Sequence, residues 1–183
     1  MYGLVNQAME DMIRQEWGQS AWDSIKQSAG VEEGRFVSMR AYPDHITYDL
    51  VQAASQHSQE SLPSLLEAFG KHWIAYTMKN GYGDMMDMWG SDLTTLLQNL
   101  DQMHARIGSS HSDFQPPSFV CHVQEDGSLL LEYHSQRPSL SHFVMGLILG
   151  LGEKFGTPVT VAQEQDKASG APHDLFSITF NKA

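Results

Sequence analysis

The hydrophobic pattern of this sequence changes period once, at the turn-rich segment GSSHSDFQPPS, and that change limits the possible folds more than any other feature. Before the segment, apolar residues recur every three or four positions, which is typical of amphipathic helices. After it they alternate with polar residues, which indicates strands. We therefore predict an α+β fold in which a helical N-terminal lobe, residues 1–110, packs on an α/β lobe, residues 111–183, within a single domain.

The expected helices and strands follow from these periods and from the residues that end them. Ser20 and Ser91 are the expected N-caps of two helices, and Asn80-Gly81 stops a third. The turn at residues 125–127 is typical of a β-hairpin. We expect helices over residues 1–18, 20–30, 47–56, 62–81, 91–108 and 139–155, and a four-stranded antiparallel sheet from strands over residues 119–124, 128–133, 158–163 and 174–180.

The charge and the cysteine content exclude several classes of protein. The formal charge is −11, from 22 acidic and 11 basic residues, so the chain lacks the basic face that nucleic acids and anionic membranes attract. The longest apolar run, FVMGLILGLG, is too short to span a bilayer, and the N-terminus lacks the basic stretch of a signal peptide. Cys121 is the only cysteine, which excludes an internal disulfide and favours a reducing, cytoplasmic location.

The stretch LLLEYHSQRPS places three hydrogen-bond donors on one side of an extended chain. Side chains alternate along a strand, so Tyr133, Ser135 and Arg137 share the face of Leu129 and Leu131. A phenol, a hydroxyl and a guanidinium in a row are suited to carboxylates, since arginine can bind one through two hydrogen bonds. The alternative is an edge strand that simply ends in solvent.

A histidine lies on the apolar stripe of the helix predicted over residues 91–108. His104 follows Leu100 by four residues and precedes Ile107 by three. It is either a structural histidine with a hydrogen-bond partner or a metal ligand. The other eight histidines form no HExxH motif and no close zinc pairing in the sequence. A single histidine suits an iron already held by a macrocycle, and haem also carries two propionates that the three donors would match.

Four motifs together give the chain a resemblance to a known family. They are MYGLVNQAMEDMI at the start, NLDQMHARIG around His104, PPSF at 116–119 and YHSQR at 133–137. In order and spacing the sequence resembles the haem nitric-oxide/oxygen binding domains, the family that includes the haem-sensing domain of soluble guanylate cyclase. The resemblance runs over essentially the whole chain and implies haem b, iron protoporphyrin IX, buried between the two lobes.

The resemblance also implies roles for individual residues. His104 takes the position of the iron ligand on the proximal side of the haem. Pro117 takes the position of a proline that presses on the porphyrin and bends it, and Asp44 that of a carboxylate that helps to hold the arginine. The propionate-binding motif corresponds to Tyr133, Ser135 and Arg137.

On the opposite, distal side of the haem position, the residues of this chain differ from those of the oxygen-binding members of the family. Those members carry a tyrosine on the helix after the donor strand, whereas this chain has Phe143, counted back from Gly146, or His142, counted forward from the motif. Met9 stands where they have an indole. Trp73 takes another distal position, where its N–H is either a donor to a bound ligand or part of ordinary packing.

We therefore expect a non-enzymatic gas sensor that binds nitric oxide and carbon monoxide at ferrous haem b and forms no stable dioxygen complex. Nitric oxide opposite His104 would break the iron–histidine bond, free the helix over residues 91–108 and let the lobes rotate. The signal would pass to a separate partner, a histidine kinase or a cyclic-dinucleotide enzyme by family resemblance. The alternatives are a peroxidase-type haem enzyme that uses His142 and a cofactor-free interaction domain.

Overall fold

The computed structural model describes residues 1–109 and 115–181, and its first lobe is helical. The middle of the predicted lobe junction, residues 110–114, therefore lies outside the described residues. The helices are α1 (Gly3–Trp17), α2 (Gln19–Ser28), α3 (Asp44–Ser58), α4 (Leu62–Thr77), α5 (Gly83–Trp89) and α6 (Leu93–Gly108), with a kinked segment, Met78–Tyr82, between α4 and α5.

The second lobe is a four-stranded sheet with one helix against it. The strands run in the order β1-β2-β4-β3, and each neighbouring pair is antiparallel. The elements are β1 (Ser118–Val123), β2 (Leu129–His134), α7 (Ser141–Lys154), β3 (Val159–Gln165) and β4 (Asp174–Phe180), with a short 3-10 turn at Lys167–Ser169. The α+β prediction and the four-stranded antiparallel sheet are confirmed.

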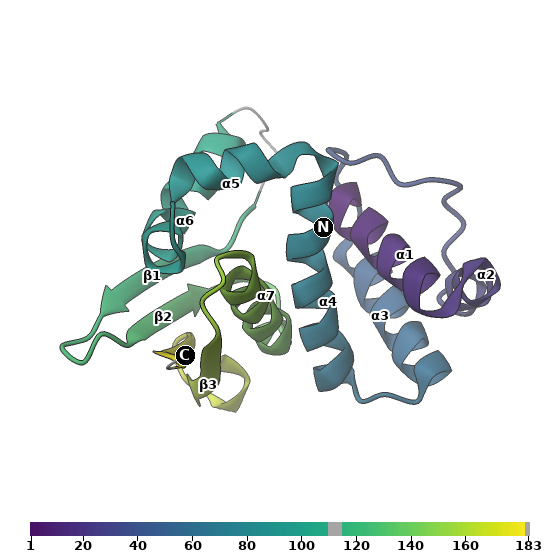
Figure 1. Cartoon of the computed structure of the whole chain (residues 1–183). Coiled ribbons are helices and arrows are strands. Elements are labelled where there is room, and N and C mark those ends of the chain that lie inside the picture. Colours follow the sequence, from purple (N-terminus) through teal and green to yellow (C-terminus); the bar gives the residue numbers. More distant parts are fainter. Residues whose placement is uncertain (110–114, 182–183) are drawn as a thin grey trace.

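Helix α4 stands at the centre of the molecule. In Figure 1 it runs between α1, α2 and α3 on one side and α7, the sheet and α6 on the other. One apolar core joins α1 to α4, and a second joins the end of α4 to α6, α7 and the sheet. Trp73 packs against both cores, so α4 supplies packing surface to each lobe.

Two glycines let α4 and α7 approach each other at backbone distance. A Cβ atom built on Gly70 would lie 2.2 Å from the carbonyl oxygen of Phe143, and one built on Gly146 would lie 2.0 Å from that of Glu67. Real Cβ atoms do not come so close to a carbonyl oxygen, so only glycine fits at either position. The glycines therefore fix how tightly the two helices cross.

The structure corrects several predicted helix boundaries. Helix α6 is capped by Asp92 rather than Ser91, because the Asp92 carboxylate accepts a hydrogen bond from Thr95 N at 2.8 Å. Helix α2 begins at Gln19 behind Gly18, so Ser20 is not its cap.

Two helices also differ in extent. Helix α3 begins at Asp44, three residues earlier than predicted, and its carboxylate suits the positive end of the helix. Helix α4 ends at Thr77, four residues before its predicted end, and Asn80 and Gly81 leave the helical conformation as predicted. The sequence analysis missed α5, a seven-residue helix whose burial of Met86 in the second core stabilises it.

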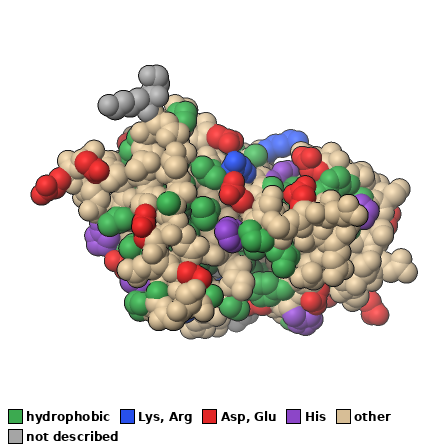
Figure 2. Space-filling view, turned by 90° about the horizontal axis from the view of Figure 1, so that it is seen from below, with side chains coloured by type: hydrophobic (Ala, Val, Ile, Leu, Met, Phe, Trp, Pro, Cys, Tyr) green, Lys and Arg blue, Asp and Glu red, His purple; other side chains and the backbone are tan. Residues whose placement is uncertain are grey.

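The face shown in Figure 2 agrees with the acidic composition, because acidic side chains are spread across it while the few basic ones in view gather in one place. In the described part of the chain, no helix combines the length and the apolarity that crossing a bilayer demands.

We predict that Gly146→Ala lowers the free energy of unfolding by about 1–3 kcal/mol, because the new methyl group overpacks the α4–α7 crossing. The gain in helix propensity from alanine opposes this by at most about 1 kcal/mol. Gly34→Ala is the matched control, since nothing lies within 4 Å of a Cβ atom there. Denaturant unfolding measures both, and equal midpoints for Gly146→Ala and wild type would show that the crossing tolerates a side chain.

Candidate functional site

His104 lies on α6 and faces a small apolar cavity between the lobes. The cavity has a volume of about 90 Å³. Its walls come from α4, α5, α6, α7 and the first two strands. The lining residues are Trp73, Ile74, Met86, Leu96, Leu97, Leu100, Met103, His104, Phe119, Leu131, Val144, Leu147, Ile148 and Leu151. His104 and Trp73, predicted for opposite sides of a haem, thus border the same space.

The imidazole of His104 is uncharged at neutral pH. Its burial lowers the pKa of His104 to about 4, and the nearby charge of Asp101 only partly opposes this shift. A neutral imidazole keeps a nitrogen lone pair, which is the form that binds a metal ion. His104 therefore has the protonation state that an iron ligand requires.

Phe119 connects His104 to the donor strand, and the sequence analysis did not single it out. Its ring stacks on the His104 ring with centroids 5.7 Å apart and lies 5.3 Å from the ring of Tyr133, its partner in the β1–β2 register. Phe119 N also donates to Asp101 Oδ1 at 3.2 Å, which ties β1 to α6. The alternation that predicted a strand at Phe119 was a signal from which its place on the buried face of the sheet could also have been predicted.

The three donors of the YHSQR segment do not stand in one extended row. Tyr133 is buried, at 4% exposure, and burial raises its pKa against the effect of a hydrogen bond with Ser135. Strand β2 ends at His134, and the chain then turns so that Ser135 Oγ accepts a hydrogen bond from Arg137 N at 3.0 Å. The expectation of strict alternation is therefore right for Tyr133 and wrong beyond the strand end.

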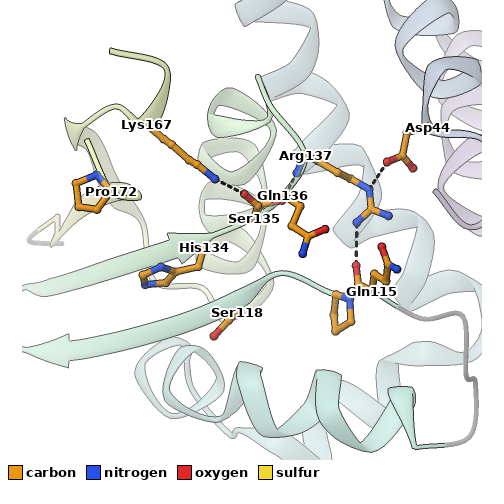
Figure 3. Close-up of a pocket in the computed structure, with 10 residues that line it drawn as sticks. Asp44, Gln115, Ser118, His134, Ser135, Gln136, Arg137, Lys167 and Pro172 are labelled. Carbon is orange, nitrogen blue, oxygen red and sulfur yellow. Dashed lines mark hydrogen bonds and ion pairs between the residues drawn. The ribbon is translucent and has the colours of Figure 1, made fainter. Parts of the chain in front are cut away.

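Arg137 is held from two sides, as Figure 3 shows. Its Nε donates to Asp44 Oδ2 at 2.9 Å, and one terminal nitrogen donates to the carbonyl oxygen of Gln115 at 2.8 Å. Asp44 also accepts from the N-terminal ammonium of Met1. The structure thus brings Asp44, from α3, to the arginine as the resemblance implied.

A larger polar cavity of about 480 Å³ opens around these groups. Lys167, which the sequence analysis missed, points into the same region and donates from Nζ to the carbonyl oxygen of Ser135 (Figure 3). Two cations, the hydroxyls of Ser118 and Ser135 and the carboxylate of Asp44 border this space. The cations outnumber the one carboxylate, which suits an anionic group. The lining residues are Asp44, Gln115, Pro116, Ser118, His134, Ser135, Gln136, Arg137, Lys167 and Pro172.

The remaining predicted residues do not line the polar cavity. Met9 is fully buried in the first core, and Phe143 packs against that core with its ring 5.0 Å from Phe69. His142 lies beside Phe143 and is only partly buried. Pro117 is half-buried immediately before β1, where Pro116 rather than Pro117 lines the polar cavity.

Curated proteins similar to this chain are cyclases of much greater length. A family model described as haem-NO-binding matches residues 2–163. The chain is 29% identical over 151 residues to the soluble guanylate cyclase gcy-32 of Caenorhabditis elegans, an alignment that covers 81% of this chain and 22% of that protein. It is 25% identical over 183 residues to the soluble guanylate cyclase 89Db of Drosophila melanogaster, covering 98% and 27%. The chain thus spans about a quarter of the length of these relatives.

Solved structures share the complete fold. The crystal structure of an H-NOX protein from S. oneidensis in the Fe(II)NO ligation state superposes with a TM-score of 0.91 at 20% identity, covering 100% of both chains. The Fe(II) unliganded H-NOX protein from K. algicida gives 0.83 at 21% identity, covering 100% of this chain and 98% of that one. Both lobes and their arrangement are therefore shared with these proteins.

We predict that Asp44→Asn lowers the free energy of unfolding at neutral pH by about 0.2–1 kcal/mol, the usual range for a solvent-exposed ion pair. Burial alone would raise the pKa of Asp44, but the N-terminal ammonium and Arg137 outweigh it and hold the pKa below its ordinary 3.8. A lowered carboxyl pKa contributes stability above 3.8, and this is lost as the pH falls through the folded-state value.

Urea unfolding at pH 7 and at acid pH measures this effect, and the deficit of Asp44→Asn should shrink on acidification. Glu67→Gln is the control, because its pair with Lys71 is longer, at 3.7 Å, and lies within α4. A deficit independent of pH would mean that the Asp44 charge does not stabilise the fold.

Proposed function

The chain belongs to the haem-NO-binding, or H-NOX, family, and on that premise we propose that it is a non-enzymatic gas sensor that binds nitric oxide and carbon monoxide at ferrous haem b. The observation that carries the proposal is the neutral imidazole of His104 at an apolar cavity, linked through Phe119 to the donor strand. We further propose that residues 1–183 act as one sensor domain, in the cytoplasm.

The residues fit a haem in their chemistry. An uncharged imidazole, apolar walls and a group of hydroxyl and guanidinium donors match an iron, a porphyrin face and two propionates. In size, the 90 Å³ cavity beside His104 is smaller than the roughly 300–1,000 Å³ of ordinary cofactor sites. A macrocycle would therefore need more room between α6 and the α4–α7 pair than this cavity provides.

Each residue then has a role that its position supports. His104, on α6, would supply the protein ligand to the iron, and Pro117, immediately before β1, would press on the porphyrin. Tyr133, Ser135 and Arg137 hold the propionates, and Asp44 keeps the guanidinium directed by its 2.9 Å contact.

A bound haem would supply a ferrous iron as the binding site for the gas, and gas binding there would weaken the bond between the iron and His104. The chain's own part is to convert the release of His104 into movement. Helix α6 is tied to β1 through Asp101 and Phe119, so a shift of α6 carries β1 with it. Helices α4 and α7 are packed at backbone distance at Gly70, so the two would stay together as one unit. Two packed units that move against each other form a two-state switch.

The output passes to a separate partner protein, and we propose a histidine kinase or a cyclic-dinucleotide enzyme. The relatives named above are guanylate cyclases of greater length, which supports signalling to a nucleotide enzyme as the broader class.

An absorption spectrum of the reduced protein, alone and with nitric oxide, tests the proposal. A haem spectrum that shifts with nitric oxide supports the sensor. A colourless protein that gains no haem on reconstitution contradicts it, as does turnover of peroxide well above that of free haem.

His104→Gly should lose haem, or should hold it only when imidazole is added to replace the missing ligand. His57→Gly is the control, because His57 is an exposed histidine on α3. Haem content after purification and the iron–histidine vibration measure the effect. Normal values for both in His104→Gly would refute the assignment.

Wild type should bind no dioxygen stably in air, because dioxygen on ferrous iron is polarised and needs a distal donor that Phe143 and Met9 lack. Phe143→Tyr should introduce measurable dioxygen binding, since a neutral hydrogen bond is worth about 0.5–1.5 kcal/mol, or roughly an order of magnitude in affinity. Phe155→Tyr, just after the end of α7, is the control. Spectra in air decide, and a stable dioxygen spectrum in wild type would point to Trp73 or His142 as the donor.

A further inference from the structure

The solvent-facing side of the sheet carries a group of histidines around one glutamate. Side chains alternate across β2, so Glu132 and His134 point away from the face that buries Leu131 and Tyr133. The β1–β2 register pairs Val120 with Glu132 and Leu130 with His122, which puts His122 and Glu132 on one face at diagonal positions.

His173 joins this group from a distant part of the sequence. Strand β4 pairs with β2 so that Tyr133 faces Asp174, and His173 is the residue just before that pair. It therefore arrives beside His134, with the two ring centroids 4.5 Å apart. Residues 39 positions apart in the sequence thus meet because of strand register.

The ligand atoms of three of these side chains converge. Nε2 of His134 lies 2.9 Å, and Nε2 of His173 3.8 Å, from the same Glu132 oxygen, Oε2. One ligand atom from each of the three residues lies within 4.8 Å of the others. The second carboxylate oxygen, Oε1, is 3.1 Å from Nε2 of His122. Three potential ligand side chains thus converge on one point of the sheet, and His122 contacts the carboxylate through its other oxygen.

We propose that Glu132, His134 and His173 form a binding site for a divalent transition-metal ion of the zinc type, separate from the His104 cavity. His122 orients the carboxylate through its other oxygen. Two imidazoles and a carboxylate are the protein ligands of known three-ligand zinc sites, which keep a fourth position for water.

The spacing suits such an ion. Zinc lies about 2.0–2.1 Å from imidazole nitrogen and about 2.0–2.2 Å from carboxylate oxygen, so tetrahedral ligand atoms stand roughly 3.4 Å apart. The two distances to Glu132 Oε2 lie on either side of that value. The three side chains are 27%, 42% and 19% exposed, so small rotations are free to close the site and an ion can reach it from solvent.

The arrangement differs from an ordinary hydrogen-bonded surface cluster in one respect. When a carboxylate only accepts hydrogen bonds, the donors around it can be divided between its two oxygens. Here two ring nitrogens turn to one oxygen while His122 takes the other. Hydrogen bonds from His134, which has the larger effect, and from His122 lower the pKa of Glu132, and this keeps the carboxylate charged.

A metal at this site would brace the strand that carries the propionate donors. It would join β2 to the segment before β4, and the contact between His122 and Glu132 would connect β1 to the same site. Tyr133 lies between Glu132 and His134 on the opposite face of β2. His134 also borders the polar cavity near Arg137, so the proposed ion would lie next to that cavity (Figure 3).

The test uses the haem-loaded full chain without a histidine tag, freed of metal by a chelator that leaves haem in place. Zinc is added in competition with a chromophoric chelator, and the thermal midpoint is recorded with and without zinc. Wild type should bind one zinc ion and melt at a higher temperature with it, because a ligand of the folded state stabilises that state.

His134→Gln and His173→Gln should each weaken zinc binding by at least about tenfold, and His122→Gln should weaken it by about 10-fold to 100-fold, as loss of an orienting group does. His57→Gln should bind like wild type and serves as the matched control. If either variant folds poorly, Glu132→Gln replaces it.

Equal zinc affinity in wild type and in His134→Gln would overturn the proposal, as would a stoichiometry below one ion. The haem absorption spectrum is recorded in the same samples, as a readout of haem binding that does not depend on zinc. Failure of zinc binding with haem retained would refute this site and leave the gas-sensor proposal standing.

Discussion

The close crossing of α4 and α7 is the contact on which the rest of the structure depends. Gly70 and Gly146 allow the two backbones to touch, and this brings the apolar faces of both helices into contact. On one side of the crossing Phe69 meets Phe143, and on the other Trp73 reaches the cavity that His104 faces. Helix α6 and strand β1 form the opposite side of the same cavity.

The period of the sequence predicted the two lobes and most elements, because each element buries a long apolar face. Strand β4 was predicted with its observed bounds, Asp174–Phe180. The missed helix, α5, has seven residues and owes its stability to one buried methionine, Met86, whose partners are far away in the chain. Ser91 and Asp92 are equally good caps by residue type, and only backbone conformation distinguishes them.

The candidate site was predicted only in part from residues alone. Helical spacing placed His104 on the buried stripe, but its role and that of Asp44 came from the family resemblance. Phe119 and Lys167 were missed because their proximity to the site arises from strand pairing and from a loop that returns to β2. The histidine group on the sheet was missed for the same reason, since no local spacing links His122 to His173.

Because α4 belongs to both apolar cores, we expect that neither lobe can unfold independently of the other. Loss of the first core removes the packing partners of Trp73 and Phe69, and loss of the second exposes Ile74 on the same helix. With this shared central helix, the haem-free chain should therefore lose its structure in one cooperative transition, in which the calorimetric and van't Hoff enthalpies agree. The two lobes are distinct in architecture but share one central helix.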